Sequence, residues 1–315
     1  MPRLQQRGVA IALEGERPAR LAVAMDAQVA AAAYAYAVRA RCPLIHYVWD
    51  LPPWRLGRGR NDWVWFTMGR YVRVPRLGRR YAERPGYYSR LRFVATRARE
   101  VWVPSALTAT SVRERWGLDP RHVPFCFDSD RFTLPPPPRA AARPEGLISV
   151  SRLTAHKDHA AVLRAAARFQ PMLPVRLVGS GPEREPLARL AAELGVPCRI
   201  ESGLSPEEMV TAYQRAEVVV CPSRFEGFGL TPMEAIACGR PVVVSDIPPH
   251  REFLGTTPHY FPLGNDDALF AAIRAARTSP PPAPAILEGV RIEAAVERFS
   301  RGLVPYLDGS RPLRD

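Results

Sequence analysis

Residues 217–244 have the pattern of strand, glycine turn, helix and strand, and this order constrains the fold more than any other part of the chain. An apolar run at 217–221 precedes Gly227-Phe228-Gly229, a helix is predicted from Thr231-Pro232, and a second apolar run follows at 241–244. Glycines let a turn backbone approach a ligand closely, and a helix N-terminus presents unpaired N–H groups and a positive dipole end. The segment therefore predicts an α/β unit with a turn suited to a phosphate.

The same alternation continues through the C-terminal half. Strands are predicted at 147–150, 175–178 and 198–201, and helices at 158–169, 183–194 and 206–215. The third helix follows a capping box, Ser205 with Glu208. Strands that alternate with helices form a parallel sheet whose ligands bind at the carboxyl ends of the strands. Gly179 and Gly181 follow a strand, so we expect them to line one site with the turn at 227–229.

Proline runs indicate the domain organisation. Four prolines follow Leu134, and consecutive prolines neither pair in a sheet nor continue a helix, so a linker is predicted there. The N-terminal half has weaker strand patterns, and a last helix is predicted near 286–303. The predicted parts are an N-terminal domain, 1–134, a linker, 135–143, a C-terminal domain, 144–285, and a crossing helix with its tail, 286–315.

Composition excludes several classes of protein. Hydrophobic residues make up 47% of the 315 and charged residues 24%, which is typical of a globular chain. The five cysteines form no Cys-x-x-Cys pair, so buried thiols in a reducing compartment are expected. We see no secretory signal and no apolar stretch of membrane-spanning length, and we expect a cytoplasmic protein.

Residues 222–239, with the stretch 239–252 after them, resemble the Glu-x7-Glu motif of the retaining glycosyltransferases of family 4. Glu226 and Glu234 are the two glutamates of that motif. The resemblance extends over about residues 101–305 and is poor before them, where the family's opening Gly-Gly turn is missing. It implies an α/β protein of the GT-B fold, with two Rossmann-like domains facing across a cleft and a C-terminal helix returning to a shortened N-terminal domain.

The resemblance implies a transferase acting on a nucleotide diphosphate sugar, with mannose weakly favoured by the stretch 247–252. A departing diphosphate develops negative charge that cations or dipoles must stabilise. The family's Arg-Leu-x-x-x-Lys pattern places Arg152 and Lys157 on the diphosphate, and its first glutamate, Glu226, near the donor sugar. Its second glutamate, Glu234, contacts the ribose. The other expected donor-binding residues are Gly179, Gly181, Gly227, Phe228, Gly229 and Leu230.

Each of these assignments competes with a structural interpretation. Arg152 and Lys157 have the pattern of solvated cations near a helix start, and Lys157 is the single lysine among 44 basic residues. Glu234 has the spacing of a capping box with Thr231, which would make it a partner of its own helix. Glu226 has Arg224 close by as a candidate partner.

Metal and acceptor sites are less constrained. The chain has no Asp-x-Asp metal motif, so we expect neither a metal nor a cofactor, and fixed cations would take the metal's place. Family members are thought to react on the front face, with a donor phosphate oxygen taking the proton of the acceptor. Trp49 and Asp50, after a strand-like segment, are weak candidates for the acceptor side.

Residues 54–99 hold thirteen arginines with interleaved tryptophan, phenylalanine and tyrosine, against Asp62 and Glu83. Arginines with interfacial aromatic rings favour an anionic membrane surface, and a peripheral location at the inner face would suit a lipid-linked or glycan acceptor. Nucleic acid is the less favoured partner. A solvated face of an arginine-rich protein is the competing interpretation.

Two other functions fit parts of the sequence. The missing Gly-Gly turn favours a non-catalytic subunit that binds a nucleotide sugar or a partner enzyme. An isomerase of the nucleotide-sugar 2-epimerase kind would need acid/base histidines and carboxylates together, and no such cluster is visible. The four residues Arg152, Lys157, Glu226 and Glu234 favour the transferase.

Overall fold

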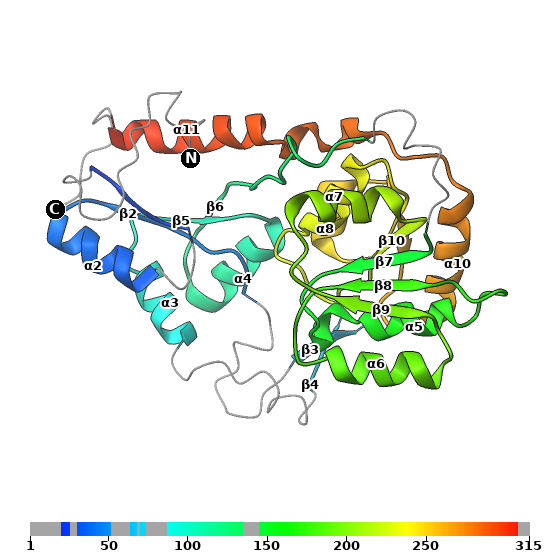
Figure 1. Ribbon diagram of the computed structural model, residues 1–315. Helices are drawn as coiled ribbons and strands as arrows, with labels where there is room; N and C mark the ends of the chain where they lie inside the picture. The colour runs from blue at the N-terminus through cyan, green and yellow to red at the C-terminus, as the bar shows by residue number, and fades with distance from the viewer. Residues whose placement is uncertain are drawn as a thin grey trace. The chain divides into compact units, whose positions relative to one another are not determined.

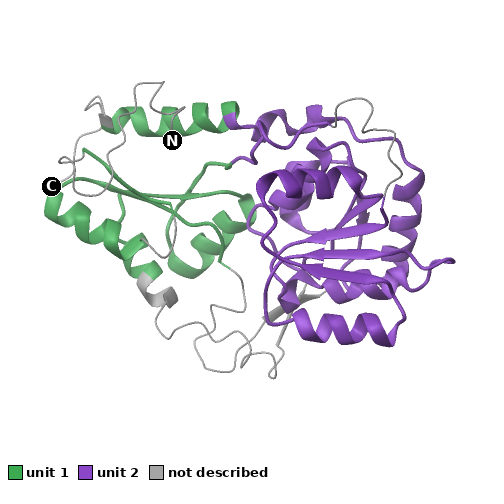
Figure 2. Cartoon of the chain, viewed as in Figure 1, with its two compact units in different colours: residues 1–65, 71–125, 293–315 green, residues 66–70, 126–292 purple. Residues whose placement is uncertain are grey.

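The computed structural model describes residues 20–25, 30–51, 64–67, 70–73, 87–134 and 145–307, with the backbone alone at 64–67, 70–73 and 87–90. The chain forms two compact units (Figure 2). Unit 1 comprises residues 1–65, 71–125 and 293–315, and unit 2 comprises residues 66–70 and 126–292. The predicted linker, 135–143, lies outside the described residues.

Unit 2 is built on a parallel sheet of six strands in the order β12-β11-β10-β7-β8-β9. The strands are β7 (Leu147–Val150), β8 (Val175–Val178), β9 (Cys198–Glu201), β10 (Val218–Cys221), β11 (Val242–Ser245) and β12 (His259–Phe261). The chain order reverses between β7 and β10, which pair directly through Ile148 and Val219. Ligands of open α/β sheets bind beyond the carboxyl ends of the strands at such a reversal. The loops after β7 and β10 therefore carry the positions of interest.

Helices cover both faces of this sheet (Figure 1). They are α5 (His159–Ala166), α6 (Arg184–Glu193), α7 (Pro206–Arg215), α8 (Leu230–Ala237), α9 (Pro248–Leu254) and α10 (Asp266–Thr278). Helices α5, α6 and α10 share one hydrophobic core with the strands, in which Leu163, Leu177 and Ile273 are completely buried. Burying one such side chain contributes about 1.5–3 kcal/mol. Helix α8 packs on β10 and β11 and contacts α7.

Most predicted elements of unit 2 are confirmed, with changes at their ends. The strands 147–150, 175–178 and 198–201 are as predicted, and the capping box is present, with Glu208 N donating to Ser205 Oγ at 3.1 Å. The first helix, predicted to reach residue 169, ends at Ala166. The last helix, α11, spans Ile292–Leu307, because Pro284–Val290 forms a 3-10 helix in place of the predicted start at 286.

Unit 1 has a parallel sheet of four strands in the order β1-β2-β5-β6. Its elements are β1 (Ala22–Ala24), β2 (Leu44–Tyr47), β5 (Glu100–Val103), β6 (Arg121–His122), α2 (Ala30–Ala40), α3 (Tyr87–Ala95) and α4 (Ala106–Trp116). Strands β3 (Val64–Thr67) and β4 (Arg70–Arg73) pair separately. On one face of the sheet, Phe299 and Tyr306 of α11 pack with Tyr47 and Trp102. The predicted return of the C-terminal helix to the N-terminal domain is confirmed.

All five cysteines are free, and Cys221 and Cys238 are buried. Within the described part of the chain, none of the helices combines the length and the apolar character that spanning a bilayer demands.

Candidate functional site

Two crossed ion pairs join the loop after β7 to the loop after β10. Lys157 Nζ lies 2.5 Å from Glu226 Oε1, and Arg224 Nη2 lies 2.6 Å from Asp158 Oδ2. The side chains of Lys157 and Glu226 are 11% and 18% exposed. Arg224, the alternative partner considered for Glu226, pairs with Asp158, and Lys157 is the cation that holds Glu226. Neighbouring loops at the reversal of the sheet therefore bring a cation and a carboxylate of the predicted site together.

This pairing controls the protonation of Glu226. Burial is the largest single effect and raises the pKa of this carboxyl, but the charge and hydrogen bond of Lys157, together with smaller effects of His250 and Ser223, lower the pKa of Glu226 to about 2. Glu226 is therefore an ionised hydrogen-bond acceptor over the whole physiological range, and it is a weak base.

Arg152 presents a cation at the same edge of the sheet. It is exposed, and no carboxylate among the described residues pairs with its guanidinium. Gly179 and Gly181, both with φ of 152°, lie under this loop, and a Cβ on them would come within 1.9 Å of Ser151 O and 2.2 Å of Leu153 O. The two glycines are needed for the close approach of the loops after β7 and β8, which fixes the backbone around Arg152.

Helix α8 begins at Leu230 with its N-terminus unsatisfied by side chains. Its N-cap is Gly229, with φ of 88°, and no side-chain hydrogen bond caps it. The predicted capping box of Thr231 with Glu234 is wrong, because the glycine starts the helix earlier and Thr231 Oγ1 instead donates to Val150 O at 3.0 Å. Phe228 is buried against Phe253, with ring centroids 4.5 Å apart, which anchors the turn 227–229. The free N–H groups of this turn can bind an anion.

Glu234 is partnered by a neutral group. Its Oε2 accepts a hydrogen bond from Tyr213 Oη at 2.8 Å, and no cation pairs with it among the described residues. Burial raises the pKa of Glu234, while the bond from Tyr213 opposes that effect. One oxygen of the carboxylate is thus fixed, and the group keeps capacity for further donors.

His250 is a residue of this site to which sequence reasoning assigned no role. It is buried on α9, and its Nδ1 lies 2.8 Å from Ser245 O, so Nδ1 carries the proton. Nε2 has no partner among the described residues, and the ring lies against Gly229, where a Cβ would be 3.3 Å from Cδ2. Burial lowers the pKa of His250, which keeps the ring neutral beside the turn.

Sequence reasoning also missed the partner Tyr213 and the pairing of Arg224 with Asp158. A signal was present only for Arg224, which stands two residues before Glu226. Asp158 occupies the N-cap position of α5, but with φ of 50° and no capping hydrogen bond, because its carboxylate pairs with Arg224.

The two acceptor-side candidates lie in unit 1. Trp49 packs at the edge of an aromatic cluster, with its ring centroid 4.6 Å from that of Phe125, and its indole N–H donates to Met25 O. This packing gives Trp49 a structural role, and the acceptor role of Trp49 and Asp50 stays a prediction. Of the segment 54–99, side chains are described only from Leu91 onward, so most of its arginines lie outside the described residues.

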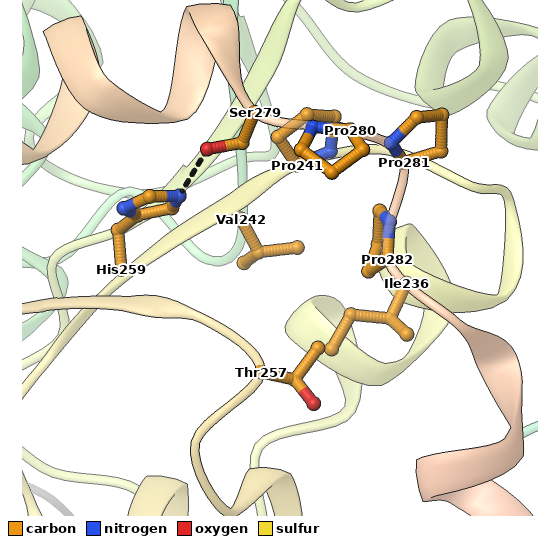
Figure 3. A pocket seen from close by; sticks show the side chains of 9 residues that line it. All are labelled: Ile236, Pro241, Val242, Thr257, His259, Ser279, Pro280, Pro281 and Pro282. Atoms are coloured by element: carbon orange, nitrogen blue, oxygen red, sulfur yellow. Dashed lines mark hydrogen bonds between the residues drawn. The ribbon is translucent and has the colours of Figure 1, made fainter.

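A cavity of about 260 Å³ lies elsewhere in unit 2, at the amino ends of β11 and β12 (Figure 3). It is lined by Ile236, Pro241, Val242, Thr257, His259, Ser279, Pro280, Pro281 and Pro282. Its one drawn hydrogen bond joins His259 Nε2 to Ser279 Oγ at 2.9 Å. None of the predicted site residues lines this cavity. Across the described residues, no group of three or more His, Cys, Asp or Glu is arranged to hold a metal ion.

Comparison with known proteins adds a family. The family described as Glycosyl transferases group 1 matches residues 130–285. The GDP-mannose-dependent alpha-(1-6)-phosphatidylinositol monomannoside mannosyltransferase of Mycolicibacterium smegmatis is 34% identical over 141 residues, which are 39% of this chain and 37% of that protein. A D-inositol 3-phosphate glycosyltransferase of Corynebacterium jeikeium is 37% identical over 147 residues, 40% of this chain and 35% of that protein. The match thus extends over little more than a third of either relative.

Solved structures resemble a larger part of the chain. HepE of Anabaena, in complex with UDP and glucose, has a TM-score of 0.73 at 17% identity and covers 90% of this chain and 78% of its own. Sucrose-phosphate synthase from Thermosynechococcus elongatus has a TM-score of 0.74 at 19% identity, over 94% of this chain and 75% of its own. At these identities the likeness shows the fold alone.

Proposed function

Because residues 130–285 form a domain of the Glycosyl transferases group 1 family in a chain of the GT-B fold, we propose that the protein transfers a sugar, with retention, from a nucleotide diphosphate sugar to an acceptor. The observation that supports this most is the meeting of Lys157, Glu226 and the N-terminus of α8 where the strand order reverses. Cations, an ionised acceptor and free N–H groups there match the charge and the hydroxyls of such a donor.

In this proposal the diphosphate binds between the basic groups and α8. Arg152, exposed and without a carboxylate partner among the described residues, is a ready phosphate ligand. Lys157 donates to the phosphates as well as to Glu226, because an ammonium has three N–H donors. The N–H groups at Gly229 and Leu230 add dipole stabilisation. Together they would stabilise the negative charge that develops as the glycosidic bond breaks.

Glu226 would accept hydrogen bonds from the donor sugar, and Glu234 from the ribose. With a pKa of about 2, Glu226 is poorly suited to take a proton from the acceptor. This supports a front-face reaction, in which a phosphate oxygen of the donor accepts the acceptor's proton and no protein nucleophile takes part.

We also propose that no metal ion is needed, so activity in excess EDTA should persist. Loss of activity that magnesium restores would contradict this.

The donor is proposed to be GDP-mannose and the acceptor a glycan or a lipid-linked sugar, as in polysaccharide biosynthesis at the cytoplasmic face of a membrane. The support is the name of the mycobacterial relative, which is GDP-mannose-dependent and acts on a phosphatidylinositol monomannoside. The basic segment 54–99 would bring the protein to an anionic membrane surface.

The alternative is a subunit that binds a nucleotide sugar without transferring it. What favours it is the missing Gly-Gly turn, which in the family reaches the donor phosphates. The two functions separate in one experiment. A thermal-shift screen of GDP-mannose, UDP-glucose and their nucleoside diphosphates identifies a donor, since a ligand of the native state raises Tm by mass action.

Release of the nucleoside diphosphate from that donor, with and without candidate acceptors, then tests catalysis, and proton NMR of the product gives its anomeric configuration. Release with an α-linked product supports retaining transfer. Binding with no release under any acceptor supports the non-catalytic subunit, and an inverted product contradicts retention.

A further inference from the structure

We propose that Tyr213 is a positioning residue that aims Glu234 at the ribose of the bound nucleotide, and so sets the preference of the protein for ribonucleotides over 2′-deoxyribonucleotides. The inference rests on the proposed function, because it requires a nucleotide at α8. Tyr213 lies on α7, outside every motif that points to this site.

The contact between the two residues is buried and direct. Tyr213 is completely buried, and its hydroxyl donates to Glu234 Oε2 at 2.8 Å. Its ring is held against Phe132, with centroids 5.8 Å apart at 70°. A buried phenol needs a partner for its hydroxyl, and Glu234 fills that need. Packing in the core therefore fixes the orientation of the Tyr213 hydroxyl before any ligand binds.

Helix α8, which carries Glu234, is also hydrogen-bonded to the end of strand β7. Thr231, beside the phenol on α8, donates to Val150 O at 3.0 Å, and Val150 is the last residue of β7. This hydrogen bond holds α8, and with it Glu234, in place on β7. The loop after β7 carries Arg152 and Lys157. Arg152 and Lys157 would bind the diphosphate and Glu234 the ribose of one nucleotide, and β7 would fix the positions of all three residues.

The carboxylate keeps its remaining acceptor capacity for a ligand. A carboxylate has about four lone-pair positions, and among the described residues Tyr213 alone donates to the side chain of Glu234. Two further positions suit the two hydroxyls of a cis-diol. Without the phenol hydroxyl, the flexible glutamate would have to be ordered by the nucleotide itself, which weakens binding.

A purely structural role for this hydrogen bond predicts something different. It would tie α7 to α8, and its loss would lower Tm without changing which sugar the nucleotide carries. The ratio of affinities for ribo- and 2′-deoxyribonucleotides separates the two roles, because stability affects both ligands equally.

The experiment measures Kd by calorimetry for GDP, UDP and their 2′-deoxy forms on the full chain and on Tyr213→Phe. Phenylalanine keeps the packing against Phe132. We expect the unsubstituted protein to bind its preferred ribonucleotide about 10-fold more tightly than the 2′-deoxy form, the scale of a hydrogen bond to a charged group. In Tyr213→Phe most of that ratio should be lost. Tyr306→Phe is the matched control, because Tyr306 Oη also donates to a glutamate, Glu100 Oε1 at 2.6 Å in unit 1, and it should keep the ratio.

The outcomes separate the inference from the proposed function. A lower Tm with an unchanged ratio in Tyr213→Phe would overturn the positioning role while leaving nucleotide binding and transfer intact. Equal affinity of the unsubstituted protein for ribo- and 2′-deoxy forms would overturn it as well. Binding of neither GDP nor UDP by the unsubstituted protein would contradict the proposed function and the inference together.

Discussion

Glu226 and Glu234, with seven residues between them, have surroundings that shift the pKa of the two carboxyls in opposite directions. Glu226 lies in the turn after β10 and accepts from an ammonium, which lowers its pKa to about 2. Glu234 lies in α8 and accepts from a phenol, and burial raises its pKa. A cation can both stabilise and anchor a buried carboxylate, whereas a neutral donor anchors it at a higher proton affinity. Repeating one residue type in a motif therefore says little about the charge that each copy holds.

The largest expected effect follows removal of the cation. Lys157→Ala should lower turnover on the donor found in the screen by at least about 100-fold, the scale of one lost electrostatic stabiliser. The control is Arg277→Ala, which removes a cation from another ion pair of unit 2, with Glu217, and should keep turnover. Turnover of Lys157→Ala within a few-fold of normal would show that this cation does not act on the diphosphate.

Removing the charge of Glu226 tests how much its ion pair with Lys157 contributes to stability. Glu226→Gln keeps the size of the side chain but leaves Lys157 buried beside a neutral amide. The free energy of unfolding should fall by about 3 kcal/mol, the scale of breaking a largely buried ion pair. Urea denaturation of the unliganded protein at neutral pH measures it. An unchanged midpoint and slope would mean that the pair contributes nothing to folding.

The same substitution at the second carboxylate should leave stability nearly unchanged. Glu234→Gln keeps an oxygen that can accept from Tyr213, so the buried hydrogen bond survives. Affinity for the nucleotide should fall about 10-fold through loss of charged acceptors, with turnover at saturating donor much less affected. Donor KM and turnover are measured together. A fall in Tm with an unchanged KM would assign Glu234 to structure alone.

The smallest effect is in the pH dependence of binding. As pH falls from about 8 to about 5, Glu226 stays ionised, whereas Glu234, whose pKa is raised, begins to take up a proton. Protonation removes an acceptor, so nucleotide affinity should decrease with falling pH by a few-fold more in the unsubstituted protein than in Glu234→Gln. The groups facing Glu234 are Tyr213, Asp128, Cys221 and Cys238, and burial raises the pKa of both thiols and of the phenol, which keeps them neutral. Parallel pH curves for the two proteins would contradict this.

Sequence alone predicted five of the six strands of unit 2, all except β12, and the two loops that meet at the site, because apolar runs and glycines are local signals. It could not predict which charged side chains form ion pairs with each other. Arg224 is two residues from Glu226 but 66 from Asp158, and the pairing with Asp158 depends on the positions of two loops after folding. The false capping box at Thr231 arose because the spacing is right but the positive φ of Gly229 starts the helix first. Tyr213 was invisible because a tyrosine on an amphipathic helix has the pattern of ordinary core.

The return of α11 to unit 1 has a consequence for the order of folding during synthesis. Tyr47 and Trp102 of the first sheet have aromatic partners that come from Phe299 and Tyr306, close to the end of the described chain. A ribosome makes the whole of unit 2 before it makes α11, so unit 2 has its full sequence first although unit 1 begins first. Until then the growing chain exposes two large aromatic faces. Release of a chain that stops near residue 292 would leave those faces open to aggregation, even with every nucleotide-binding residue already in place.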